Sequence, residues 1–329
     1  MHLLCLGVMK GLMEKWIGKK RNQAKLKNAQ ITQWKKIMDS IKPMIPSEFQ
    51  RKNFDLDFWN TWKATQFRFV LLYGGPIILK YILPVSTYKH FMLFSCACRI
   101  LLSKKLATTH VKTARLYLQK FVLLMPSIYG SRCHTINVHN LIHIADDVEF
   151  MNADLSVYSA FPFESYLGVI KYLVRTPNKP LVQVLNRLEE LDSLSSQKMK
   201  PQKIINLNIS GKKSSTDNVL NKIELNGPIL SKTCPDNIVR LKSETYMKID
   251  EILISKTDDS TINKLHLRGR VIKCRGSAFN YPQKSVFFGI IELGATVEAT
   301  KIISIDKVLN KVLLLNIEGK QFGLNFLHA

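Results

Sequence analysis

The sequence has few acidic residues, no long apolar run and no regular cysteine spacing. Asp and Glu number 25 among 329 residues, against 48 Lys and Arg, which gives a formal net charge of +23. The two most apolar stretches, residues 67–83 and 91–102, are interrupted by Arg68, Lys80 and Arg99. Neither reaches the roughly 20 uninterrupted residues that span a bilayer. We therefore interpret both stretches as buried helices and expect no membrane association.

The six cysteines match neither a disulfide scaffold nor a paired C-x-x-C zinc framework, which favours a reducing compartment. Hydrophobic residues make up 46% of the sequence, which is enough for a packed core and excludes wholesale disorder. The excess of positive charge predicts an anionic partner. Nucleic acid is the commonest such partner at this charge, and an acidic membrane surface is the next.

Apolar periodicity along the chain predicts an α+β protein with three parts. Residues 1–191 have helical spacing in most segments, for example 58–73, 87–102 and 162–174. Residues 192–235 are rich in Ser, Lys, Asn and Thr and are predicted to form a flexible linker. Residues 236–329 contain short β-type runs between turn residues, which predict a small β-rich module. The expected strands are 238–241, 246–254, 267–273, 286–293, 301–305 and 312–316.

A cluster of basic residues follows the predicted N-terminal helix. Such a segment can follow phosphates, while Trp16 and Trp34 at its ends can stack on bases. A solvated face of the protein explains the same charges equally well. The candidates for DNA binding are Lys19, Lys20, Arg21, Lys25, Lys27, Lys35 and Lys36.

His139 and His143 are spaced i, i+4, which can bring two imidazoles onto one helix face for zinc. The zinc-protease pattern needs a Glu directly after the first His, and Asn140 stands there instead. We therefore predict that these histidines pack between helices.

Five phrases of the sequence are informative in combination: residues 1–10 (MHLLCLGVMK), 62–68 (WKATQFR), 72–76 (LYGGP), 137–148 (NVHNLIHIADDV) and 159–168 (SAFPFESYLG). In order and spacing they resemble the transposases of CACTA-type (En/Spm-like) DNA transposons, in the divergent form found in animal genomes. Residues 236–237, 289–290 and 326–328 also look like the tail of such proteins. The resemblance implies that residues 1–191 comprise a helical insertion region and the remnant of an RNase H-like core.

Such transposases resemble nucleases in which two Asp and one Glu hold two divalent metal ions, Mg²⁺ or Mn²⁺. The resemblance assigns the third carboxylate, which is also a metal ligand, to Glu164, and it matches His2 to the His of an Asp-x-x-His phrase. Both Asp positions of the family pattern would precede Met1, so no cofactor is expected in this chain. A surface Glu is the alternative for Glu164, because the helix dipole favours a carboxylate in a first turn.

These observations lead to one expectation and two alternatives. We expect a truncated transposase-derived protein that binds DNA in the nucleus, is not catalytically competent alone, and has a full-length transposase or a second copy as a further partner. The first alternative is a domesticated protein-interaction scaffold without a DNA function. The second is a fragment of an active two-metal DNA strand-transferase whose N-terminus is missing, so the sequence leaves enzymatic activity undecided.

Overall fold

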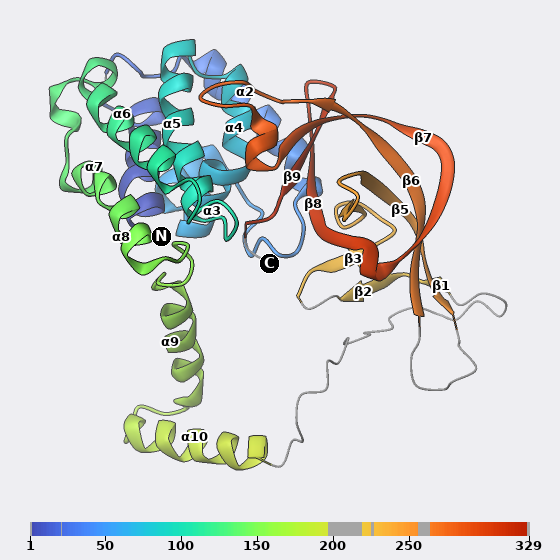
Figure 1. Cartoon of the computed structure of the whole chain (residues 1–329). Coiled ribbons are helices and arrows are strands. Elements are labelled where there is room, and N and C mark those ends of the chain that lie inside the picture. The colour runs from blue at the N-terminus through green and yellow to red at the C-terminus, as the bar shows by residue number, and fades with distance from the viewer. Residues whose placement is uncertain (1, 21, 197–218, 225–226, 256–263, 328–329) are drawn as a thin grey trace.

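The structure, a computed structural model, describes residues 2–20, 22–196, 219–224, 227–255 and 264–327 (Figure 1). The described residues up to 196 form helices and no strand. The α-helices are α1 (Lys10–Ile17), α2 (Asn28–Ile41), α3 (Ala64–Phe69), α4 (Gly75–Ile78), α5 (Val85–Leu101), α6 (Val111–Tyr129), α7 (Ile136–His139), α8 (Ile144–Met151), α9 (Phe161–Leu173) and α10 (Pro180–Ser196). Two π-helices, η1 (Leu3–Met9) and η4 (Val70–Gly74), are continuous with α1 and with α3 and α4.

Short 3₁₀-helices connect these elements and recur in the C-terminal part. They are η2 (Lys42–Met44), η3 (Leu56–Thr61), η5 (Leu79–Tyr81), η6 (Ser131–Cys133), η7 (Asn140–Ile142), η8 (Ser285–Phe288) and η9 (Ile305–Lys307). The strands are β1 (Val219–Leu220), β2 (Lys222–Glu224), β3 (Ile229–Ser231), β4 (Ile238–Leu241), β5 (Tyr246–Ser255), β6 (Lys264–Gly276), β7 (Ile290–Ser304), β8 (Val308–Ile317) and β9 (Lys320–Asn325).

Helix α5 forms the centre of the helical part. Every residue from His90 to Leu101 is buried, so this helix is surrounded by protein on all sides. Helix α6 packs against it through one face, on which Ala114, Leu118 and Phe121 recur at spacings of three and four residues. This arrangement confirms the interpretation of residues 91–102 as a buried helix. None of the described helices is both long enough and apolar enough to cross a membrane.

The strands β4 to β9 close into an antiparallel barrel. Pairing runs from β5 through β4, β8, β9, β7 and β6 and returns to β5. Strand β1 pairs with the C-terminal half of β5, while β2 and β3 form a separate hairpin. Closure leaves the barrel strands with few unpaired edges, which protects them from pairing with another chain.

The helices and the barrel share one hydrophobic core. The same cluster of buried side chains contains Leu72 and Phe94 from the helical part and Phe288, Leu313 and Leu324 from the barrel part. Two side-chain contacts also connect the parts. The Arg99 guanidinium, buried in α5, donates to the carbonyl oxygens of Leu72 and Phe288, and Lys80 Nζ donates to the carbonyl oxygen of Ala278 at 3.0 Å. Burial lowers the pKa of Arg99 to about 10, so it remains charged at neutral pH.

The α+β class predicted from the sequence is confirmed. The predicted strands at 238–241 and 246–254 agree closely with β4 and β5, whereas the predicted strand at 286–293 contains the 3₁₀-helix η8 and only the start of β7. Strands β1, β2 and β3 lie between residues 219 and 231, inside the stretch predicted as linker. The three strands are only two or three residues long, and β1 and β2 each include an exposed residue, so the polar composition of the stretch hid them. Residues 197–218 of that stretch lie outside the described residues.

Candidate functional site

The fold brings His2 and Glu164 into direct contact. His2 immediately precedes the π-helix η1, and Glu164 lies in the first turn of α9. His2 Nε2 is 2.9 Å from Glu164 Oε1, and both side chains are about half exposed, at 42% and 57%. The His2 ring also meets Phe161 edge to face, with ring centroids 5.0 Å apart. The two residues that the transposase resemblance singles out therefore form one site.

This contact lies at the edge of a cleft with a volume of about 440 Å³. Its walls come from η1, from the segment before η3, from the start of α3 and from the start of α9. They include the charged residues His2, Glu48, Arg51, Lys63, Arg68 and Glu164, together with Thr65 and Phe69. The volume falls within the range of small-molecule sites, roughly 300–1,000 Å³.

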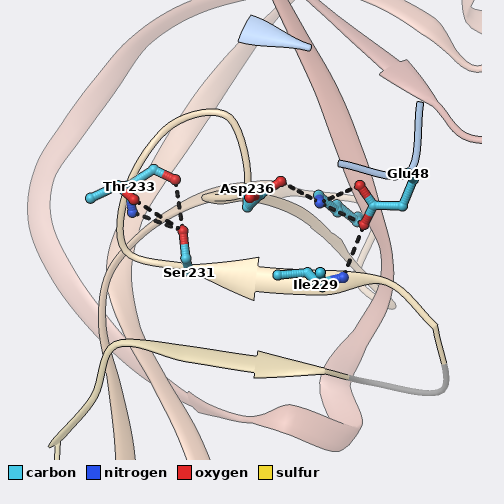
Figure 2. A network of polar contacts seen from close by, with 6 residues as sticks. Glu48, Ile229, Ser231, Thr233 and Asp236 are labelled. Carbon is cyan, nitrogen blue, oxygen red and sulfur yellow. Dashed lines mark hydrogen bonds and ion pairs between the residues drawn. The ribbon is translucent and has the colours of Figure 1, made fainter. Parts of the chain in front are cut away.

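Glu48, on one wall of the cleft, belongs to a buried network that joins the helical part to the barrel (Figure 2). Its carboxylate accepts two hydrogen bonds from Lys311 Nζ, at 2.7 and 2.9 Å, and one from the Ile229 backbone N–H at 2.9 Å. Lys311, with a side chain only 1% exposed, also donates to Asp236 Oδ1 at 2.6 Å. Three donors of the ammonium group thus meet carboxylate oxygens, which leaves Glu48 fully engaged.

Arg68 lies between the cleft and the helical core. Its Nε atom is buried and has no hydrogen-bond partner in the described part of the chain, and the same holds for Thr65 Oγ1. Burial raises the pKa of the neighbouring Cys5 thiol to about 12, and the positive charge of Arg68 acts in the opposite direction. Cys5 is therefore a protonated, buried thiol, whereas Arg68 supplies unsatisfied positive charge.

The predicted DNA-binding residues lie on and before α2. Lys19, Lys20, Lys27 and Lys36 are exposed, and Arg21 lies outside the described residues. The other two are engaged: Lys25 Nζ donates to the carbonyl oxygen of Lys19 at 3.1 Å, and Lys35 forms an ion pair with Asp57 at 2.6 Å. Four lysines of the segment therefore present their charge to solvent.

The prediction that Trp16 and Trp34 stack on bases is wrong. Both indoles are buried, at 0% and 1% exposure, with ring centroids 6.4 Å apart. Trp16 also donates from its indole nitrogen to the Tyr129 hydroxyl at 3.3 Å. Because each tryptophan lies on the apolar face of its helix, it completes the core between α1, α2 and α6, and the basic segment has no aromatic platform from either residue.

The prediction that His139 and His143 pack between helices is also wrong, because both side chains are exposed. Their rings lie 5.3 Å apart, and His143 Nδ1 is 3.8 Å from Asp146 Oδ2. Across the ranges that the structure describes, no group of three or more His, Cys, Asp and Glu is arranged to hold a metal ion.

The Glu164 site does not fit the two-metal centre that the family resemblance implies for complete transposases. Such a centre requires three carboxylates that bridge two ions, and Mg²⁺ strongly prefers oxygen ligands. The cleft offers Glu164, which is paired with an imidazole, and Glu48, which is engaged by Lys311. The arrangement supplies hydrogen bonds and positive charge instead.

Sequence reasoning missed several residues of the cleft, among them Glu48, Arg51, Lys63, Thr65 and Arg68. A signal existed for three of them, because they belong to residues 62–68, one of the phrases that carry the transposase resemblance. Arg51 lies in a stretch without periodicity, and only the fold shows that it lines the same cleft as Glu164.

Comparison with known proteins gives one match. Residues 206–326 match a family described as a domain of unknown function (DUF8592). This region contains all the barrel strands and the β1 to β3 segment, so the match supports the β-rich part as a recurring unit. Searches of curated proteins and of solved structures found no match.

Proposed function

We propose that this chain is a transposase-derived protein of a CACTA-like DNA transposon that binds DNA in the nucleus. The observation that carries the proposal is the 2.9 Å contact between His2 and Glu164. These residues belong to two phrases that lie far apart in the sequence of the helical part, and the resemblance assigns both phrases to one active site. A resemblance by chance would give no reason for the two phrases to meet in space.

DNA binding is supported by the excess of positive charge and by its location. The exposed lysines Lys19, Lys20, Lys27 and Lys36 have no ion-pair partner within the described residues. Phosphate contacts by such side chains provide most of the affinity of sequence-independent DNA binding. The proposal therefore assigns backbone contacts to the basic segment and leaves direct base recognition unassigned.

The test is binding of a fluorescent duplex of arbitrary sequence, followed by anisotropy. In one variant Lys19, Lys20, Lys27 and Lys36 are all replaced by Gln. The matched control replaces four exposed lysines elsewhere, Lys104, Lys105, Lys112 and Lys120, and so has the same net charge. We expect the first variant to lose most of its affinity and the control to lose little. Equal losses would show that overall charge, and not the basic segment, attracts DNA.

Cleavage is not part of the proposal, because a two-metal mechanism needs three carboxylates and the resemblance assigns only Glu164 to this sequence. We expect no nicking of supercoiled plasmid by this chain with Mg²⁺ or Mn²⁺. Nicking that disappears in Glu164→Ala would instead support the alternative of an active strand-transferase.

A second candidate function, a protein-interaction scaffold, is favoured by helices α9 and α10. They extend away from the rest of the helical part, and no residue of α9 is buried (Figure 1). Phe163, Tyr172 and Leu181 are 73%, 89% and 69% exposed. Large exposed apolar surfaces of this kind mark interaction sites. If the protein is an interaction scaffold, the triple variant Phe163→Ser, Tyr172→Ser, Leu181→Ser should lose binding of its protein partner and keep its duplex affinity.

A further inference from the structure

The cleft beside Glu164 has unsatisfied donors on its wall. Arg68 Nε and Thr65 Oγ1 are both buried from solvent, and neither has a hydrogen-bond partner in the described ranges. A buried polar atom without a partner destabilises the folded state, so such atoms are rare in folded proteins. Two of them, three residues apart on α3 and both lining one cleft, indicate that a ligand supplies the missing acceptors.

The charges of the cleft indicate what that ligand is. Its acidic residues are already paired, since His2 contacts Glu164, and Lys311 with the Ile229 backbone N–H satisfies Glu48. The cations of the cleft, in contrast, have no ion-pair partner among the described residues; they are Arg51, Lys63 and Arg68. The unsatisfied groups of the cleft are therefore positively charged donors together with one hydroxyl.

We infer that this cleft binds a phosphate group, held by Arg68 and Thr65 at its wall and by Lys63 and Arg51 at its mouth. A phosphate offers several acceptor oxygens around one centre and is negatively charged as a diester and as the free ion, which suits three cations with several donors. The planar guanidinium of Arg68 matches phosphate oxygens in a bidentate geometry, and the flexible Lys63 acts as a point charge. The volume of about 440 Å³ also accommodates part of the molecule that carries the phosphate.

This inference goes beyond the proposed function, because it assigns phosphate recognition to residues outside the basic segment of α2. It holds for a phosphate of a nucleic-acid backbone and for a free phosphate. The two sources share the same chemistry at Arg68 and Thr65 and differ only in what enters the rest of the cleft.

The experiment is titration calorimetry of the full chain with inorganic phosphate, and separately with inorganic pyrophosphate, at constant ionic strength set with chloride. We expect saturable binding to one site. Lys63→Gln and Arg68→Gln should each weaken binding about tenfold or more, because each removes a charge-assisted contact. Lys120→Gln, which removes an exposed charge outside both the cleft and the basic segment, should leave the dissociation constant within about twofold.

Lys63 is exposed, so Lys63→Gln keeps the test valid even if Arg68→Gln fails to fold. Absence of saturable binding of both anions overturns the inference, and so does equal weakening by Lys63→Gln and Lys120→Gln. The source is identified with a duplex. If the phosphate belongs to DNA, Lys63→Gln also weakens duplex binding and pyrophosphate competes with the duplex; if it is free phosphate, duplex binding is unchanged. If only the variant of Lys19, Lys20, Lys27 and Lys36 loses duplex binding, the DNA proposal stands and the cleft binds free phosphate, so the two proposals fail separately.

Discussion

Replacement of Lys311 by Met is the perturbation that the buried network makes most informative. The Lys311 ammonium contacts Glu48 and Asp236 at 2.6–2.9 Å, and the side chain is 1% exposed. Methionine has similar length and fills the same volume, so packing changes little. Two carboxylates, 13% and 17% exposed, then remain without their cation. Removal of one partner from a buried ion pair destabilises proteins by about 3–5 kcal/mol.

Denaturation by urea, followed through the fluorescence of the buried Trp16 and Trp34, measures this effect. We expect Lys311→Met to lower the free energy of unfolding by about 3–5 kcal/mol. Lys320→Met, the same substitution at an exposed lysine of β9, should change it by no more than about 0.5 kcal/mol.

The triple variant with Glu48→Gln and Asp236→Asn should recover part of the loss, because it removes both unpaired charges and keeps an acceptor for the Ile229 N–H. A loss below about 1 kcal/mol for Lys311→Met would refute the reasoning, since it would place the interaction in the range of a solvated ion pair. If the triple variant recovers none of the lost stability, then lost packing, and not unpaired charge, destabilises Lys311→Met.

Three further predictions concern the helical part. Burial lowers the pKa of His90 from 6.5 to about 4, although its Nε2 hydrogen bond to the Phe121 carbonyl opposes this. Folding therefore favours the neutral imidazole, so the contribution of His90 to stability is complete above pH 6.5 and is lost towards pH 4. At about 1.4 kcal/mol per pKa unit, the free energy of unfolding should be about 2 kcal/mol lower at pH 5 than at pH 7. In urea titrations the His90→Gln variant should lack this pH-dependent contribution. A Cβ at Gly75 would lie 2.0 Å from the Val70 carbonyl oxygen, so Gly75→Ala should lower the unfolding free energy by about 1–3 kcal/mol. A Cβ at Gly11 in α1 meets nothing within 4 Å, so Gly11→Ala should raise the free energy of unfolding by about 0.4–1 kcal/mol. Thermal denaturation should show a correspondingly higher melting temperature.

The sequence predicted elements well where burial follows a simple period. Strand β4 has three buried residues in four and was predicted with its observed bounds, and the predicted helix at 87–102 corresponds to α5. Strand β9 was missed because it contains Gly323, and glycine is uncommon within strands. Helix α9 was predicted correctly as a helix, but its apolar stripe indicated burial and every one of its residues is at least partly exposed.

The candidate site was predictable only in part, for a physical reason. Motif phrases identified His2 and Glu164 separately, but their contact depends on how η1 and α9 meet in the fold. Glu48 and Arg51 lie in a stretch without periodicity, and their roles follow from partners far along the chain. Local sequence reports which face of an element is apolar; it does not report which polar groups end up without a partner.

The salt dependence of duplex binding tests the central proposal most directly. Affinity should fall linearly in a plot of log association constant against log salt concentration, with a slope of about −0.9 for each phosphate neutralised. The variant without the charges of Lys19, Lys20, Lys27 and Lys36 should have a slope shallower by about 3 to 4, and the control with four other lysines replaced should keep that of the parent protein. A parent protein without measurable duplex affinity at low salt, or identical slopes for all three proteins, would contradict the assignment of DNA binding to this segment.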